Sequence, residues 1–217
     1  MVSNIFFDLD GTLTDSKEGI ENCYHYAFQR LNRVYPAEIK MNDLIGPPLR
    51  IAFRKLLRSD DEILIERAVA IFRERFSTVG LFENKVYPGI PEILSSLHQD
   101  CYRLYIVTSK MKIYADRIVD HFQLSPWFNG IFGAVLEGRF DNKAELIEFI
   151  LNDRNLAAEE TVMIGDRKED IEAGKTNRIR TIGVTYGYGT KEEIIDSAPD
   201  YICASPSDIQ KTIKRIR

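Results

Sequence analysis

The chain has 217 residues, of which 44% are hydrophobic and 29% are charged, which suits one globular domain or a domain with an insertion. Its formal net charge of −4 excludes the basic footprint of a nucleic-acid-binding protein. No apolar run approaches membrane-spanning length, no signal-peptide pattern precedes the first strand, and the three cysteines form no Cys-x-x-Cys pair. We therefore expect a cytoplasmic protein with reduced thiols and no nucleic-acid or membrane partner. The sequence does not fix the oligomeric state, and we expect a monomer or a weak homodimer.

A short apolar run near the start of the chain leads into two aspartates. The composition of residues 5–7 is typical of a buried strand, and Asp8-Leu9-Asp10-Gly11 follows directly. Residues two apart in an extended chain point to the same side, so Asp8 and Asp10 can face one site at the end of the strand. Gly11 allows a sharp turn and the close approach of a ligand. Two carboxylates in such a place are costly unless a cation or hydrogen bonds compensate them, so the first hypothesis is a metal site.

The next block has helical periodicity and no strand signal. Apolar residues at spacings of three and four predict helices over residues 17–34, 49–57 and 60–79, with a turn-rich interruption around Gly46-Pro47-Pro48. From residue 83 onward, short runs rich in β-branched and aromatic residues alternate with helical patterns. The strands are expected over residues 102–107, 131–135, 161–164, 180–184 and 201–202.

This alternation predicts a doubly wound, mainly parallel sheet with helices on both faces, that is, an α/β fold. The strand at residues 5–7 must join the same sheet, because a lone strand is not stable. The helical block is therefore an insertion. We expect residues 1–15 and 83–217 to form the α/β core and residues 16–82 to form a small helical cap domain.

Ligands bind at the carboxyl ends of the strands in open parallel sheets. Those ends carry Asp8 and Asp10, then Thr108 and Ser109, then Asp166 with Asp170 shortly after it, while Lys143 opens an intervening helix. Each signal alone has an ordinary alternative. Thr108-Ser109 can cap a helix, Lys143 can be solvated, Gly165-Asp166 is a common turn, and Asp170 suits the first turn of a helix. Together they indicate one chemistry.

That chemistry is phosphoryl transfer. Magnesium takes carboxylate oxygens, which Asp8 and Asp166 can supply, and Thr108 and backbone N–H groups near Ser109 can donate to phosphate oxygens. Lys143 can neutralise negative charge on the phosphate. A carboxylate beside the phosphorus can act as the nucleophile, and a second one at i+2 can protonate the leaving alkoxide and then deprotonate water.

The order and content of these motifs resemble the haloacid dehalogenase superfamily across essentially the whole chain. The resemblance rests on Asp8-Leu9-Asp10-Gly11-Thr12-Leu13, Thr108-Ser109-Lys110, Lys143 and Gly165-Asp166-Arg167-Lys168-Glu169-Asp170. The helical insertion and the run Ile182–Gly189 are similar to the phosphoglycolate phosphatase-like branch. The first and last motifs are highly specific, and the other two are specific only in their company.

The resemblance implies a role for each position. Asp8 would be the nucleophile and a Mg²⁺ ligand, and Asp10 the general acid/base with its backbone carbonyl on the metal. Thr108, Ser109 and Lys143 would hold the phosphate. Asp166 would bind the metal directly, and Asp170 would support the metal site. In the cap, Gly46 lies in a segment similar to a substrate-facing loop, and Arg50 could meet a second anionic group.

The resulting expectation is a Mg²⁺-dependent phosphomonoesterase that hydrolyses a small phosphorylated metabolite, first of all a phosphoglycolate-like one, through an aspartyl-phosphate. A 5′-nucleotidase, a pyrophosphatase, a β-phosphoglucomutase-like phosphomutase and a non-catalytic phosphate-binding protein remain as alternatives. The intact set of acids, hydroxyl and lysine argues against the last of these. The sequence assigns no role to the loop at residues 185–190.

Overall fold

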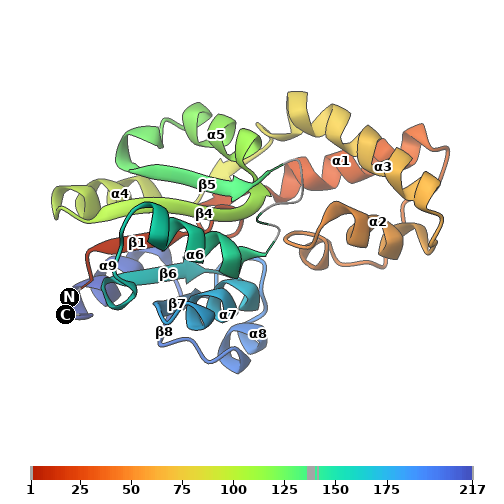
Figure 1. Cartoon of the computed structure of the whole chain (residues 1–217). Coiled ribbons are helices and arrows are strands. Elements are labelled where there is room, and N and C mark those ends of the chain that lie inside the picture. Colours follow the sequence, from red (N-terminus) through yellow and green to blue (C-terminus); the bar gives the residue numbers. More distant parts are fainter. Residues whose placement is uncertain (1, 136–139, 141, 217) are drawn as a thin grey trace. The chain divides into compact units, whose positions relative to one another are not determined.

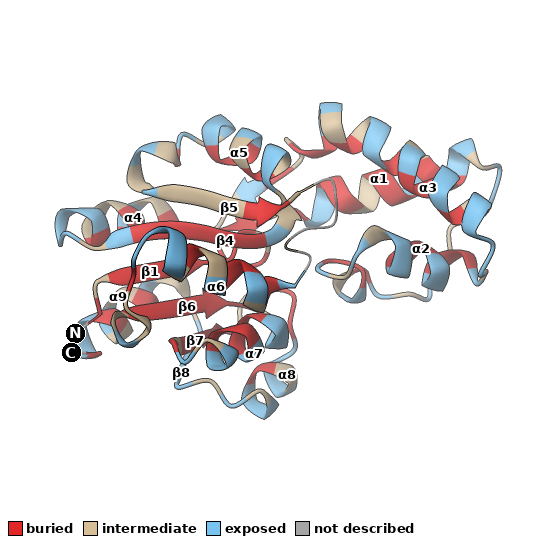
Figure 2. Ribbon diagram, in the orientation of Figure 1, coloured by how far each residue is buried: buried red, intermediate tan, exposed pale blue. Residues whose placement is uncertain are grey.

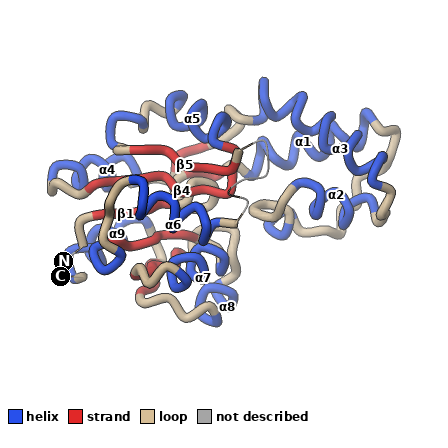
Figure 3. The backbone as a smooth tube through the Cα atoms, viewed as in Figure 1, coloured by secondary structure: helices blue, strands red, loops and turns tan. Residues whose placement is uncertain are grey.

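The chain divides into two compact units, one made of Met1–Asp15 with Val86–Arg217 and the other of Ser16–Lys85. The computed structural model describes residues 2–135, 140 and 142–216. Strands and helices alternate in the first unit, and the second unit is helical (Figure 3). The second boundary between the units lies after Lys85, whereas the sequence pattern predicts it after residue 82.

A parallel six-stranded sheet forms the centre of the α/β unit (Figure 1). Its strands are β1 (Asn4–Phe7), β4 (Arg103–Met111), β5 (Gly130–Ala134), β6 (Thr161–Gly165), β7 (Arg180–Val184) and β8 (Tyr201–Cys203). The strand order is β5-β4-β1-β6-β7-β8, and every neighbouring pair in it is parallel. The short strands β2 (Thr14–Asp15) and β3 (Lys85–Val86) pair separately. The predicted α/β fold with a mainly parallel sheet is confirmed.

Helices cover both faces of this sheet, as right-handed crossovers between parallel strands require. They are α4 (Ile90–Gln99), α5 (Lys112–His121), α6 (Lys143–Asp153), α7 (Lys168–Thr176), α8 (Lys191–Asp196) and α9 (Pro206–Arg215), with short 3₁₀ turns at Ser125–Trp127 and Ala158–Glu160. In Figure 1, α6 and α7 pack together in front of the sheet, and α4 and α9 pack together behind it.

The central strands are buried on both sides (Figure 2). Phe6, Tyr105 and Met163 belong to a buried cluster with Leu146 and Ile147 of α6. The strand residues that alternate with them are also fully buried, since β1 places Ile5 and Phe7 on its opposite side with no exposed surface. A strand buried on both faces must be apolar at almost every position. This pattern makes the central strands recognisable in the sequence.

The helical unit contains three α-helices and two short turns. They are α1 (Lys17–Arg30), a 3₁₀ turn (Met41–Asp43), α2 (Leu49–Leu57), α3 (Glu62–Arg75) and a π-helical turn (Phe76–Gly80). One aromatic residue from each helix meets in its core. The ring of Tyr24 lies 5.2 Å from that of Phe53 and 4.9 Å from that of Phe72, and the Tyr24 hydroxyl donates to the carbonyl of Leu44. The Tyr24–Phe53 contact is edge-on and the Tyr24–Phe72 contact is tilted, and aromatic contacts of this kind add to the stabilisation that burial provides.

Two helices of this unit are shorter than predicted. The helix expected over residues 17–34 ends at Arg30, because Asn32 takes a left-handed conformation (φ 53°) and Val34 is 92% exposed and so adds nothing to a buried face. The helix expected over residues 60–79 runs from Glu62 to Arg75 before the π-helical turn. Within the described part of the chain, no helix is long and apolar enough to cross a membrane.

Candidate active site

Strand register brings three of the predicted site residues to one edge of the sheet. Phe7 of β1 is level with Ile106 of β4 on one side and with Ile164 of β6 on the other. The residues just beyond these positions include Asp8, Thr108 and Asp166, so all three lie at the carboxyl end of the sheet. Asp8, Thr108 and Asp166 are all buried, and Asp166 has no exposed surface.

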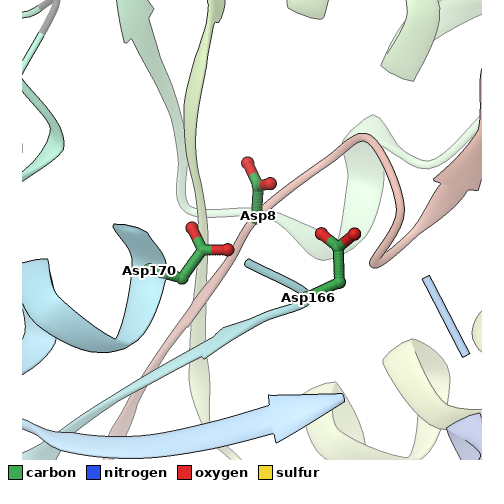
Figure 4. Close-up of side chains that lie close together, drawn as sticks. All are labelled: Asp8, Asp166 and Asp170. Atoms are coloured by element: carbon green, nitrogen blue, oxygen red, sulfur yellow. The ribbon is translucent and has the colours of Figure 1, made fainter. Parts of the chain in front are cut away.

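Three carboxylates converge at this edge, from Asp8, Asp166 and Asp170 (Figure 4). One oxygen from each lies within 4.8 Å of the oxygens of the other two, and all three residues are buried. Asp8 follows β1, Asp166 follows β6, and Asp170 lies in the first turn of α7. Buried carboxylates this close repel one another, so the cluster fits a hard divalent cation that prefers oxygen ligands.

Lys143 lies against the same cluster. It is the first residue of α6, whose start is fixed by the Asn142 side chain, which accepts from the N–H of Ala144 at 2.9 Å. The Lys143 ammonium is 3.0 Å from Asp8 Oδ1 and also donates to Asp170 Oδ1. Burial alone would lower the pKa of Lys143, but Asp170 and Asp8 more than reverse this and raise it, so the side chain stays charged.

Asp170 therefore has two roles in the structure. One oxygen accepts from Lys143, and the other accepts from the backbone N–H of Arg167 at 3.0 Å, which completes the start of α7. Asp170 is thus a helix-start acid, as one alternative from the sequence held. The same side chain also faces Asp8 and Asp166.

Asp166 is a completely buried acid of the cluster. Burial, together with the neighbouring charges of Asp8 and Asp170, raises its pKa well above the usual range of a carboxyl group, although the backbone N–H of Tyr188 acts in the opposite direction. That N–H donates to Asp166 Oδ2 at 2.7 Å, and the Thr12 hydroxyl donates to Oδ1 at 3.3 Å. The carboxylate is thus held in one orientation while its charge is incompletely balanced.

The loop at residues 185–190, to which the sequence analysis assigned no role, wraps this acid. Besides the Tyr188 N–H, the Tyr186 hydroxyl donates to the carbonyl of Thr12 at 2.9 Å, and the Tyr188 hydroxyl donates to Asp15 at 2.9 Å. A Cβ on Gly187 would lie 2.4 Å from the Asp166 Cβ, so the loop can approach only as glycine. The Tyr-Gly-Tyr-Gly run was visible in the sequence, but nothing local to it indicates which residue it packs against.

Asp10 faces a different partner. Its Oδ2 lies 2.8 Å from the Lys110 ammonium, and the two side chains are only 16% and 8% exposed. Asp10 Oδ1 is buried and has no hydrogen-bond partner among the described residues. Lys110 belongs to the Thr108-Ser109-Lys110 motif, but nothing in the sequence indicated a role for it. Ser109, between Thr108 and Lys110, is exposed.

The two cap residues belong to the helical unit. Gly46 is exposed and has a φ of 106°. The Arg50 guanidinium pairs with Glu66 at 2.5 Å and with Glu62 at 3.5 Å, and all three side chains are more than half exposed. The charge of Arg50 is therefore paired within its own unit, and its role in specificity stays a prediction.

Enzymes that transfer phosphoryl groups use acids, hydroxyls and lysines for this chemistry, and in this chain such groups lie at the carboxyl ends of parallel strands. The model of the haloacid dehalogenase-like hydrolase family matches residues 5–184, and the chain belongs to this family.

Three proteins are similar to this chain over nearly its whole length. A 5′-nucleotidase of Pseudomonas aeruginosa is 39% identical over 211 residues, which span 97% of this chain and 95% of that protein. A phosphoglycolate phosphatase of Colwellia psychrerythraea is 28% identical over 97% of this chain and 96% of its own length. The crystal structure of a predicted phosphatase from Clostridium acetobutylicum superposes with a TM-score of 0.91 at 35% identity, with 99% of each chain covered. The chain is thus an enzyme of the phosphatase type, and its family acts on small phosphate esters.

Proposed function

We propose that this protein is a Mg²⁺-dependent phosphomonoesterase that hydrolyses a small phosphorylated metabolite through an aspartyl-phosphate on Asp8. The observation that carries the proposal is the charge arrangement at the sheet edge. Four carboxylates, of Asp8, Asp10, Asp166 and Asp170, meet two ammonium groups, of Lys110 and Lys143. Negative charge is in formal excess here whether or not Asp10 carries the proton that it gives to the leaving oxygen, so a divalent cation would offset this charge before a phosphate dianion enters.

Asp8, Asp166 and Asp170 would hold the metal, Asp170 directly or through water, and the backbone carbonyl of Asp10 would complete the protein ligands. The metal, when bound, would supply positive charge to the phosphate oxygens. The set of oxygen donors and the raised pKa of Asp166 both support a hard cation at this position.

The chain's own residues account for the two chemical steps. In the first, a carboxylate oxygen of Asp8 bonds to phosphorus, the bond from phosphorus to the leaving oxygen breaks, and Asp10 gives that oxygen a proton. In the second, Asp10 takes a proton from water, whose oxygen bonds to phosphorus as the bond to Asp8 breaks. Lys143 and Thr108 would hold the phosphoryl oxygens throughout, together with backbone N–H groups near Ser109.

The leading substrate class is a phosphoglycolate-like ester, and the relative from Colwellia psychrerythraea supports it. A 5′-nucleotide is the second candidate, because the 5′-nucleotidase of Pseudomonas aeruginosa shares 39% of its residues with this chain. Gly46 and Arg50 are proposed to tune this choice from the helical unit. Arg50→Ala would then change KM for one substrate more than for the other.

The test is phosphate release from a panel of phosphomonoesters, with Mg²⁺ and with EDTA. Asp8→Asn removes the nucleophile, and Asp196→Asn, at an exposed carboxylate in α8, is the matched control. We expect Mg²⁺-dependent turnover in the wild type and in the control, and a loss of about 10⁴-fold or more in Asp8→Asn. Turnover that persists in EDTA, or in folded Asp8→Asn, would contradict the proposal.

The cellular setting is part of the same proposal. Cys23, Cys101 and Cys203 are free thiols, which agrees with a cytoplasmic enzyme. We propose that it acts as a monomer or a weak homodimer, and light scattering at micromolar and millimolar chain concentrations tests this.

A further inference from the structure

A second lysine is placed at the site beside the proposed acid. The Lys110 ammonium lies 2.8 Å from Asp10 Oδ2, and only 8% of the Lys110 side chain is exposed. Burying an ammonium is costly, and the ion pair returns that cost only in part. A lysine in such a position therefore invites a functional explanation.

The backbone of β4 is shaped to put it there. β4 continues to Met111 instead of ending at the predicted residue 107, and its pairing with β5 shifts register between Thr108 and Met111. Within this irregular stretch the N–H of Lys110 donates to the Thr108 hydroxyl at 3.2 Å. Irregularities of this kind re-aim side chains next to active sites.

The two site lysines contact different acids of the site. Lys143 contacts Asp8 and Asp170, so its charge serves the phosphoryl group. Lys110 contacts Asp10, the group that must reach the leaving oxygen. The buried Oδ1 of Asp10 has no hydrogen-bond partner among the described residues, which agrees with an oxygen that exchanges a proton with the leaving oxygen and then with water. If Asp10 protonates the leaving oxygen as proposed, the charge of Lys110 would lie near the leaving group.

We propose that Lys110 is the residue that selects phosphate compounds whose leaving group carries a second anionic group, a carboxylate or a phosphate. This inference rests on the proposed phosphomonoesterase function and narrows its substrate class. The flexible four-carbon stem of lysine lets the ammonium turn from Asp10 toward the second anion while staying near both. A neutral leaving group, such as a nucleoside or a sugar, offers the ammonium no such partner.

Matched pairs of substrates test this directly. 2-Phosphoglycolate and 2-hydroxyethyl phosphate differ in the carboxylate, and ethylene glycol bisphosphate and 2-hydroxyethyl phosphate differ in the second phosphate. We expect wild-type kcat/KM to favour the anionic member of at least one pair by about tenfold or more, and the pair that shows this identifies the anion. A wild-type ratio near one in both pairs, or adenosine monophosphate as the best substrate, overturns the inference without any variant.

Lys110→Met should then lower kcat/KM for the anionic member about tenfold more than for the neutral member. Lys112→Met is the matched control, because Lys112 pairs with Asp116 on the surface of α5 and should leave the ratio unchanged. An equal loss for both members would show that Lys110 only positions Asp10, which overturns the inference and leaves the phosphatase proposal standing. The absence of phosphate release from any compound by folded wild-type protein would overturn both.

Discussion

The backbone N–H of Tyr188 donates a hydrogen bond of 2.7 Å to Asp166 Oδ2, and so links the loop at residues 185–190 to the acid cluster. The bond comes from the main chain, so among substitutions at residue 188 only proline, which has no backbone N–H, would remove the donor. It holds in place a carboxylate whose charge would otherwise be still more costly to bury. Gly11 and Gly187 make this close approach possible, because an added Cβ would lie 2.1 Å and 2.4 Å, respectively, from an atom of the Asp166 side chain.

Gly11→Ala tests the close packing of the Gly11 backbone against the Asp166 side chain. Gly11 has a φ of 84°, and a Cβ there would lie 2.1 Å from Asp166 Oδ2. We expect a loss of about 100-fold or more in kcat/KM and a clear rise in the Mg²⁺ concentration needed for half-maximal activity, because Asp166 must move. Steady-state kinetics over a Mg²⁺ series measures both.

Gly89→Ala is the control, since Gly89 has a similar φ of 88° and nothing within 4 Å of the added Cβ. It should cost only the backbone strain, about 1 kcal/mol of unfolding free energy, and keep the activity. Equal effects of the two substitutions on activity would show that Gly11 matters only for its backbone conformation.

Asp166→Asn should have opposite effects with and without metal. In EDTA the variant should unfold at a higher temperature than the wild type, because it removes a buried carboxylate that repels Asp8 and Asp170. Mg²⁺ at about 100 times its dissociation constant should stabilise the wild type by about 2.7 kcal/mol and the variant by far less. Thermal melts of both proteins in EDTA and Mg²⁺ decide this, and equal stabilisation by Mg²⁺ would remove Asp166 from the metal site.

The juxtaposition of Asp8, Thr108 and Asp166 could be predicted from the sequence, because it follows from topology alone. Once the apolar runs are placed in one parallel sheet, the residues that end adjacent strands must meet. The alternation of strands and helices could also be predicted, because strands buried on both faces have an almost continuous apolar pattern.

Contacts that depend on irregular backbone could not be predicted. Lys110 reaches Asp10 because the pairing of β4 with β5 changes register after Thr108. No residue type between Thr108 and Met111 indicates this register shift. The loop of Tyr186 and Tyr188 folds back onto Thr12, more than 170 positions earlier in the chain. The early end of α1 at Arg30 has a local cause in Asn32, which periodicity alone does not weigh.

Lys143→Met should destabilise the metal-free protein. The substitution leaves the buried carboxylates of Asp8 and Asp170 without their ammonium partner, and breaking a buried pair in this way costs about 3–5 kcal/mol. Urea unfolding in EDTA measures the loss, and Mg²⁺ should restore part of it. Lys214→Met, which removes an exposed pair with Asp100, should cost about 1 kcal/mol or less. A similarly small cost for Lys143→Met would show that the cluster tolerates its own repulsion.

The pair of Arg75 and Glu83 predicts an acid-sensitive contribution within the helical unit. Two hydrogen bonds, of 2.6 and 2.8 Å, join the guanidinium to the carboxylate and lower the pKa of Glu83. An acid whose pKa is lower in the folded state adds stability above its unfolded pKa of about 4.3, and this stability is lost as the pH falls through the folded pKa. Because both side chains are partly exposed, solvent screening limits the contribution to roughly 1 kcal/mol.

Glu83→Gln should therefore lower the unfolding free energy at pH 7 and have progressively less effect as the pH falls below about 4. Urea unfolding of the wild type and the variant at several pH values gives this difference directly. Glu18→Gln is the control, because its carboxylate pairs with Lys85 where both side chains are more than half exposed, and it should change little at any pH. A difference between wild type and Glu83→Gln that stays constant down to pH 3 would mean that the carboxylate contributes by packing and not by its charge.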